Sequence, residues 1–302
     1  MTSGTPPHDG AHTPATIRQL WQLLEPIHAL VYFAPESYDE AGSLGYDTAE
    51  RWPLYFAFRA APLGEVAPAL VTSLFYSFTP SMVETYVAQT WHTAPAERVL
   101  TARASAVDRA LRSVLGGRID SPELAEAAQL ARGAAEATPT AGRPLAAANA
   151  ALPWPETPHG VLWHAATILR EHRGDGHLAA LQAHHLDAVE SLVLQAGVGA
   201  APVAAFENRR WSAREWGAAR DRLAARGLLA EDASATEAGL ALRTAVERLT
   251  EELAAAPWAG LTAGETARLA ELLLPPVLDV VGTGLLPAQG TLGIGMKYDY
   301  AS

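Results

Sequence analysis

An internal repeat restricts the fold of this sequence more than any other feature, because a duplicated chain must form two similar units. GYDTAERWPLYFAFRAAPLGEV at residues 45–66 resembles HLDAVESLVLQAGVGAAPVAAF at 185–206. AVDRALRSV at 106–114 resembles AVERLTEEL at 245–253. Both pairs are separated by about 140 residues and occur in the same order. The chain is therefore predicted to consist of two diverged copies of one unit.

The repeat sets the expected domain organisation. The copies should span residues 15–157 and 158–302, joined by the proline-rich segment LPWPETPHG. Residues 1–14 are polar and rich in proline and glycine, which predicts a disordered tail. The apolar share of 49% in a chain of 302 residues is sufficient for two hydrophobic cores.

Helical signals dominate both copies. In copy one, Thr79 and Ser121 each precede a proline and are expected helix N-caps. In copy two, Asp187 and Ser212 are expected N-caps, and the two glycines of RGDGH at 173–177 are expected to break a helix. Strand-like alternation is scarce, so a mainly α fold is predicted.

One stretch of copy two resembles a known regulator class. LAARGLLAEDASATEAGLALRTAVE at 223–247 is similar to the recognition helix, wing and return helix of MarR-type regulators. The resemblance covers residues 187–253 and implies a winged helix-turn-helix with a small β-wing. Applied to the repeat, it implies a tandem duplication of a MarR-like unit, a pseudo-dimer in one chain, with a degenerate first copy.

A second resemblance covers most of the chain. The runs YFAFRAAPLG, FYSFTPSMV, LREHRGDGHLAAL and PWAGL are similar to an actinobacterial family of helix-turn-helix proteins without an established activity. This resemblance supports the fold and leaves the function open.

Composition excludes several classes of function. The chain has no cysteine, so disulfides, zinc–thiolate sites and cysteine nucleophiles are excluded. It has no long apolar run or secretory leader pattern, which predicts a cytoplasmic protein without a membrane partner. The net charge of −11 argues against a protein that coats nucleic acid. No nucleotide-binding loop or nucleophile elbow is present, and no cofactor can be named.

A ligand pocket is expected where the copies meet, between the long helices and the helix-turn-helix units. Aromatic side chains with a few converging polar groups are typical of small-molecule sites. Arg59 and Arg170 would suit an anionic group through their forked donors, so a small aromatic or anionic ligand is expected. The candidate ligand-binding residues are His28, Tyr32, Tyr55, Arg59, Tyr76, His164, Arg170 and Arg173.

The segment 163–190 holds five of the ten histidines and suggests three alternatives. His172 and His177 could act with Asp175 as acid–base catalysts. A metal site formed by His164, His172 and His177 matches no standard spacing, and no metal ligands are predicted. In the third alternative, RGDGH is a structural turn whose arginine and aspartate pair with each other and cap helix ends.

Two functions follow from these patterns. The first is a small-molecule-binding protein of actinobacterial, including specialised, metabolism, with an acid–base enzyme acting on an aromatic or anionic substrate as one form of it. The alternative is a ligand-responsive MarR-like regulator that binds DNA through residues 209–226, with Arg209, Arg210, Arg214 and Arg220 as contacts. The corresponding helix of copy one, TPSMVETYVAQTW, has no basic residue. The protein is expected to be a monomer, as a pseudo-dimer, or a homodimer.

Overall fold

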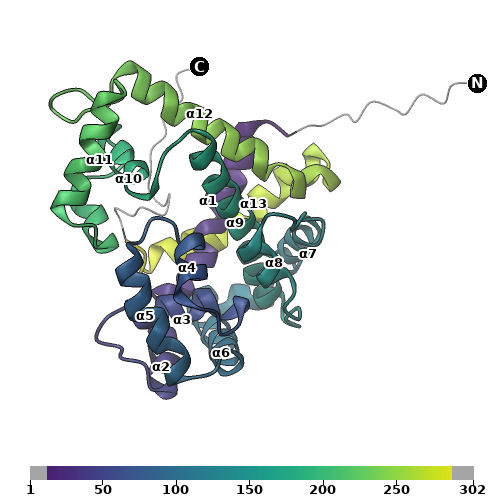
Figure 1. Cartoon of the computed structure of the whole chain (residues 1–302). Coiled ribbons are helices and arrows are strands. Elements are labelled where there is room, and N and C mark those ends of the chain that lie inside the picture. The colour runs from purple at the N-terminus through teal and green to yellow at the C-terminus, as the bar shows by residue number, and fades with distance from the viewer. Residues whose placement is uncertain (1–11, 288–302) are drawn as a thin grey trace, which may run out of the picture.

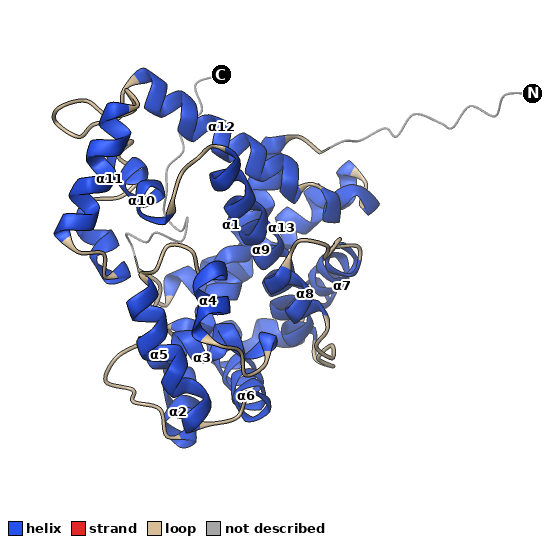
Figure 2. Ribbon diagram, in the orientation of Figure 1, coloured by secondary structure: helices blue, strands red, loops and turns tan. Residues whose placement is uncertain are grey.

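The computed structural model describes residues 12–287, which form helices joined by short loops (Figure 1). No strand occurs in this range (Figure 2), which confirms the mainly α prediction. The α-helices are α1 (Pro14–Ala29), α2 (Pro35–Leu44), α3 (Trp52–Ala60), α4 (Pro68–Leu74), α5 (Pro80–Thr93), α6 (Ala96–Leu115), α7 (Pro122–Glu136), α8 (Pro144–Ala150), α9 (Pro158–Ala183), α10 (Ala188–Gly197), α11 (Ala213–Ala225), α12 (Glu237–Ala254) and α13 (Ala263–Gly282). The 3₁₀ helices are η1 (Leu30–Tyr32), η2 (Ala61–Leu63), η3 (Gly116–Asp120), η4 (Val203–Arg209) and η5 (Ala256–Gly260).

Local capping defines most helix starts. Side chains of Thr79 and Ser121 accept backbone N–H groups at the starts of α5 and α7, as predicted, and proline follows each cap. Asp187 and Ser212 also cap their helices as predicted, and each forms a capping box with the glutamate three residues later. These four starts follow from local sequence.

Three helices form the centre of the molecule. Helix α1 packs against both α9 and α13, and α9 also packs against α7, α8 and α12 (Figure 1). Because α9 is covered on several sides, most of its residues are buried, including the polar stretch from Glu171 to Asp175. Buried charges are costly unless they are paired, so this helix requires partners from its neighbours.

Two smaller groups of helices, here called the heads, contact each other. The N-terminal head comprises α3, α4 and α5, and the C-terminal head comprises α10, η4 and α11 (Figure 1). The amide of Thr79 donates to the carbonyl of Arg209 at 3.1 Å. Trp211 Nε1 donates to the carbonyl of Ser77 at 2.9 Å, and the Tyr76 hydroxyl donates to the carbonyl of Leu186 at 2.7 Å. The two heads are therefore in direct contact, and each head donates hydrogen bonds to the other.

The predicted break at RGDGH is wrong, because α9 runs without interruption from Pro158 to Ala183. Glycine in a helix interior costs about 1 kcal/mol relative to alanine, and packing against several other helices outweighs that cost here. Gly176 also has a specific use. Its missing side chain leaves room for the guanidinium of Arg143, which donates to the carbonyls of His172 at 2.7 Å and Leu253 at 2.9 Å.

The predicted β-wing is reduced to a tight loop. Leu229 and Ala235 form one isolated antiparallel bridge, and Asp232 accepts from the amide and hydroxyl of Ser234 inside the loop. Copy one has no space for a wing, since only two residues separate α5 from α6. Of the predicted disordered tail at 1–14, residues 1–11 lie outside the described residues, and α1 already begins at Pro14.

None of the helices within residues 12–287 is both long and apolar enough to cross a membrane.

The two glycines of α9 provide a matched test of this packing. A Cβ on Gly174 would lie 3.5 Å from Glu171 Oε2, an ordinary contact, so Gly174→Ala should raise the free energy of unfolding by about 0.5–1 kcal/mol. A Cβ on Gly176 would overlap the Arg143 guanidinium, so Gly176→Ala should lower it by about 1–3 kcal/mol. Urea denaturation of both variants measures the difference. The described packing of α9 would be contradicted if both substitutions changed the free energy of unfolding equally, or if Gly174→Ala were the more destabilising of the two.

Candidate ligand-binding cavity

A cavity of about 190 Å³ lies between the two heads and the central helices. Its wall consists of residues from α1, α3, α4, α8, α9, α10, η4 and α12 and from the segment 75–78, and it combines aromatic and charged side chains. The lining residues are Trp21, Glu25, Tyr55, Arg59, Leu74, Phe75, Tyr76, Ser77, Phe78, Leu145, Arg170, Arg173, Gly174, Asp175, His177, Leu178, Leu181, Ser191, Leu192, Gln195, Arg209, Arg243 and Glu247.

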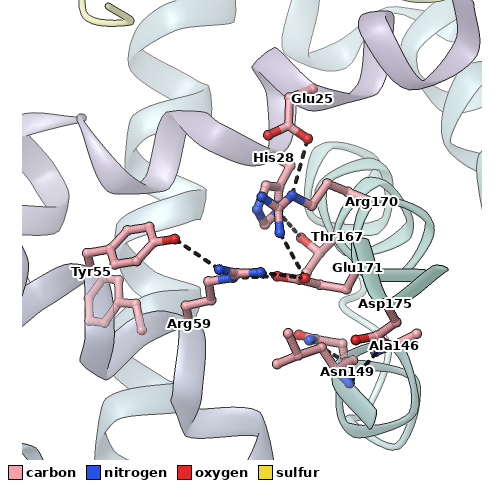
Figure 3. Close-up of polar contacts among 12 residues, drawn as sticks. Glu25, His28, Tyr55, Arg59, Ala146, Asn149, Thr167, Arg170, Glu171 and Asp175 are labelled. Carbon is pink, nitrogen blue, oxygen red and sulfur yellow. Dashed lines mark hydrogen bonds and ion pairs between the residues drawn. The ribbon is translucent and has the colours of Figure 1, made fainter. Parts of the chain in front are cut away.

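An ion network centred on Glu171 supports one side of the cavity (Figure 3). Arg59 of α3 binds this carboxylate with both ends of its fork, at 2.9 Å and 3.0 Å. Arg170 donates to it at 2.8 Å and to Glu25 of α1 at 3.2 Å. Burial acts to raise the pKa of Glu171, but Arg170 and Arg59 outweigh it and hold the pKa well below its usual value. Glu171 is therefore ionised, and both of its oxygens accept hydrogen bonds from arginines.

Arginines also lie on aromatic faces of the cavity. The Arg59 guanidinium is 4.3 Å from the centre of the Phe75 ring, and that of Arg209 is 4.2 Å from the centre of the Phe78 ring. Burial lowers the pKa of Arg209 to about 10, and the nearby positive charges of Arg51, Arg59 and Arg170 contribute, whereas Tyr55 acts in the opposite direction. Burial is the main cause, and the three neighbouring arginines add positive charge near Arg209, which favours an anion.

A second ion cluster forms the opposite wall. Glu247 of α12 pairs with Arg173 at 3.0 Å and with Arg243. Burial acts to raise the pKa of Glu247, but Arg243 and Arg173 lower it to about 2. Because the Thr250 hydroxyl donates to the carbonyl of Val246, its oxygen accepts from Nδ1 of His177 at 3.0 Å. Burial lowers the pKa of His177 to about 4, so its imidazole is neutral at pH 7.

Asp175 occupies a different environment. Its Oδ2 accepts the backbone N–H groups of Leu145 and Ala146, each at 3.1 Å, at the start of α8. Within residues 12–287, no donor reaches its Oδ1. Burial raises the pKa of Asp175 to about 6, although the backbone donors and Arg59 lower it. The side chain is thus fixed by one oxygen while the other lacks a protein partner.

The structure brings together part of the predicted ligand-binding set. Five of these residues line the cavity: Tyr55, Arg59, Tyr76, Arg170 and Arg173. His28 lies behind Arg170 and bonds to Thr167 (Figure 3), and Tyr32 packs on Tyr55 with ring centres 4.9 Å apart. His164 packs on Trp154 and lines no part of the cavity. These three are buried because the central helices cover them.

Only part of the predicted catalytic set, His172, Asp175 and His177, lies at the cavity. Asp175 and His177 line the cavity, but His172 does not, because it lies on another face of α9. Burial lowers the pKa of His172 to about 4, as it does for His177. Both imidazoles are therefore neutral at pH 7, and neither is an imidazolium that could act as a general acid. The third alternative holds only in part. Residues 173–177 are helical, and Arg173 pairs with Glu247, but Asp175 does cap a helix end, the start of α8.

Sequence reasoning missed Glu25, Arg243 and Glu247, which line the cavity, and Glu171, which lies behind its wall. Their signal is a charged residue in an otherwise apolar helical stretch, as for Glu25 between Leu24 and Ile27 of α1. The sequence separation of the pairs, up to 145 residues between Arg170 and Glu25, hides their partners. In the described part of the chain, no group of three or more histidine, aspartate and glutamate residues could hold a metal ion.

The arginines predicted to bind DNA lie in different environments. Arg209 is buried at 7% exposure and lines the cavity. Arg210 donates to the Tyr86 hydroxyl at 2.6 Å, across the contact between the heads. Arg214 and Arg220 are exposed on α11, and Arg220 pairs with Asp221 at 3.1 Å.

The fold and the site define a mainly helical protein with two heads closed around a charged cavity. The model of the helix-turn-helix family matches residues 17–287, and the chain therefore belongs to this family. Comparison with the curated proteins and with the solved structures gives no match.

Replacing Glu171 tests the ion network. Glu171→Gln leaves Arg59 and Arg170 buried without their shared carboxylate, so the free energy of unfolding should fall by about 3–5 kcal/mol. The matched control is Glu126→Gln, which removes the exposed pair with Arg268 and should change stability little. Urea denaturation at neutral pH measures the free energy of unfolding of both variants and of the wild type.

The same network predicts a pH dependence. The pKa of Glu171 is lower in the folded than in the unfolded chain, so its contribution is present above the unfolded value and disappears as the pH falls below about 4.3. Wild-type protein should therefore lose more stability than Glu171→Gln between pH 5 and pH 3. If the free energy of unfolding falls by the same amount in both proteins over this pH range, Glu171 is not ionised and paired.

Proposed function

We propose that this chain is a small-molecule-binding protein that holds a small aromatic, anionic ligand between its two heads. The observation that carries the proposal is the closure of the heads around an arginine-rich cavity. Hydrogen bonds from Thr79, Trp211 and Tyr76 hold the heads together, and the cavity lies directly behind them.

The size and wall of the cavity support a ligand of about one aromatic ring. A cavity of about 150 Å³ is sufficient to bind benzene, and this one measures about 190 Å³. Rings of Tyr55, Phe75 and Phe78 form an apolar side, which suits stacking or edge contacts with an aromatic ligand.

The charges of the cavity support an anionic ligand. Five arginines line it, and among the described residues the carboxylates of Glu25, Glu171, Asp175 and Glu247 line it or pair with those arginines. Positive charge is therefore concentrated around a largely buried space. Arg209 lies at the aromatic side, where its fork-shaped donors suit a carboxylate or phenolate.

The helix packing supports the proposed duplication. Helix α1 packs on α13 as α9 packs on α7, and α1 contacts α12 as α9 contacts α6. These pairs are related by exchanging the copies, which is the pattern expected of a pseudo-dimer with an approximate two-fold axis. The cavity then lies between the long helices and the heads, the position expected from the MarR-like resemblance.

Closure of the heads disfavours DNA reading. In a dimeric helix-turn-helix protein, two recognition helices lie about 34 Å apart to enter successive turns of the groove. Here the N-cap of α5, Thr79, is 3.1 Å from the carbonyl oxygen of Arg209, and α11 begins at Ala213. Those four residues span at most about 14 Å, so the two helix starts lie within about 18 Å of each other.

The regulator remains the competing function because the chain belongs to a helix-turn-helix family. Under that hypothesis, Arg214 and Arg220 would contact phosphates, with a second chain supplying the other head. The acidic neighbours Glu215 and Asp221 oppose this use of α11.

Ligand charge gives a direct test of the pocket. Isothermal titration should show benzoate, cinnamate or phenylacetate binding to the wild type, and the amide of the same acid should bind at least tenfold more weakly, since it lacks the charge. Arg209→Met should lower the affinity for the carboxylate by about tenfold to a hundredfold and leave the affinity for the amide unchanged. Arg220→Met, on the exposed face of α11, serves as the control. No difference between acids and amides would refute an anion site.

A DNA experiment tests the competing function. At physiological salt, the purified protein should not retard sheared genomic DNA in a mobility shift, because the heads cannot span successive grooves. The double variant Arg214→Ala, Arg220→Ala should behave identically. Retardation by the wild type that this double variant abolishes would support the regulator instead.

A further inference from the structure

We propose that the cavity selects an aromatic acid with a hydroxyl group at the end remote from its carboxylate, and that Nε2 of His177 accepts a hydrogen bond from this hydroxyl. The inference rests on the proposed function, because it assumes that the arginine-rich aromatic side of the cavity holds the anionic group. It adds the second polar group of the ligand and the residue that recognises it.

The hydrogen bonds of Thr250 fix the position of the proton on the His177 ring. The Thr250 hydroxyl has one proton, which it donates to the carbonyl of Val246 at 2.7 Å. Its oxygen can therefore only accept from Nδ1 of His177, which lies 3.0 Å away and must carry a proton. A neutral imidazole has a single ring proton, so Nε2 is left with a lone pair and can only accept a hydrogen bond.

The surroundings of His177 keep its ring neutral. Burial has the largest effect and lowers the pKa to about 4. Arg173 and Arg243 act in the same direction, whereas Glu247 opposes them. At pH 7 the ring therefore presents an acceptor at Nε2, and it is not an imidazolium with a donor at each nitrogen.

Nε2 of His177 is also accessible. His177 lines the cavity, and its side chain is 23% exposed, whereas Thr250 is fully buried. The two ring nitrogens point in roughly opposite directions, so the bond from Nδ1 to Thr250 turns Nε2 away from α12. Nε2 has no hydrogen-bond partner within residues 12–287 and retains accessible surface, unlike the two ring nitrogens of His172. A ligand group in the cavity can therefore reach it.

This acceptor and the proposed anion site lie at different ends of the cavity. The guanidinium of Arg209 is 4.2 Å from the centre of the Phe78 ring, at the contact between the heads. His177 instead bonds to Thr250 of α12. The charged side chains with the largest effects on Arg209 and on His177 have no member in common. We therefore place the hydroxyl on the third or fourth ring position of the acid and not beside its carboxylate.

The lone pair of Nε2 predicts the selectivity. A ligand that fills the cavity removes Nε2 from contact with water. A hydroxyl group on the ligand replaces the lost hydrogen bond, whereas a hydrogen atom or a methoxy group has no polar proton to offer. An acceptor left without a partner costs free energy, so the hydroxy acid should bind most tightly.

Isothermal titration at pH 7 tests this selectivity with phenylacetate, its 3- and 4-hydroxy derivatives and its 3- and 4-methoxy derivatives. At least one hydroxy acid should bind the wild type about three- to tenfold more tightly than phenylacetate, which is the effect of one net hydrogen bond. The methoxy acid of the same isomer keeps the oxygen but lacks the proton, and it should bind no more tightly than phenylacetate.

Three variants assign the acceptor. His177→Phe removes the lone pair, so the hydroxy acid should lose its advantage over phenylacetate. Thr250→Val is isosteric and lets the ring proton move to Nε2, so it should reduce the same advantage; it carries the test if His177→Phe does not fold. His92→Phe, at an exposed position near the end of α5, is the control and should keep the wild-type preference.

The tautomer of His177 can be measured without any ligand. Long-range proton–nitrogen correlation NMR of the histidine-labelled full chain at pH 7 should show this ring protonated at Nδ1 and not at Nε2. Its signals are identified by their absence from His177→Phe and by their change in Thr250→Val.

The outcomes separate this inference from the proposed function. Binding of the acids without a preference for the hydroxyl, a preference that His177→Phe retains, or a proton found on Nε2 overturns the role of His177 and leaves the anion site standing. If none of the acids binds, the ligand site itself is overturned, and the inference with it.

Discussion

The structure depends on the neutralisation of Glu171 inside the protein. This carboxylate is 1% exposed in the middle of α9, and taking such a charge out of water costs several kcal/mol. Arg59 from α3 and Arg170 from α9 offset that cost, and Arg170 extends the network to Glu25 of α1. The N-terminal head, the first central helix and α9 are therefore held in one arrangement, and Arg59 and Arg170 reach the cavity because they must reach Glu171.

This arrangement changes what a helix-turn-helix scaffold can do. The heads contact each other between residues 77–79 and 209–211, so in this arrangement they do not lie a full duplex turn apart. The same closure brings Phe75, Phe78 and Arg209 together at one side of a cavity. Under the proposed function, the contact between the heads both keeps the two helix-turn-helix units close together and closes the cavity, which links the fold to the proposed ligand site.

Local signals predicted the fold better than the site. The caps at Thr79, Ser121, Asp187 and Ser212 were correct because each depends on a few neighbouring residues. The glycine break in α9 was wrong, since packing against several other helices outweighs local propensity. Histidine clustering was a poor guide, because burial on a helix covered on several sides removed His164 and His172 from the cavity. Glu171 was missed because its partner Arg59 lies 112 residues away.

Native mass spectrometry of the full chain, purified gently from its own type of host, tests the central claim most directly, because it reports the bound ligand and the number of chains together. The account predicts a species that carries one discrete organic anion for each chain and loses it in the Arg209→Met variant. A ligand-free protein that assembles into dimers on added duplex DNA would contradict the account and identify the heads as DNA readers.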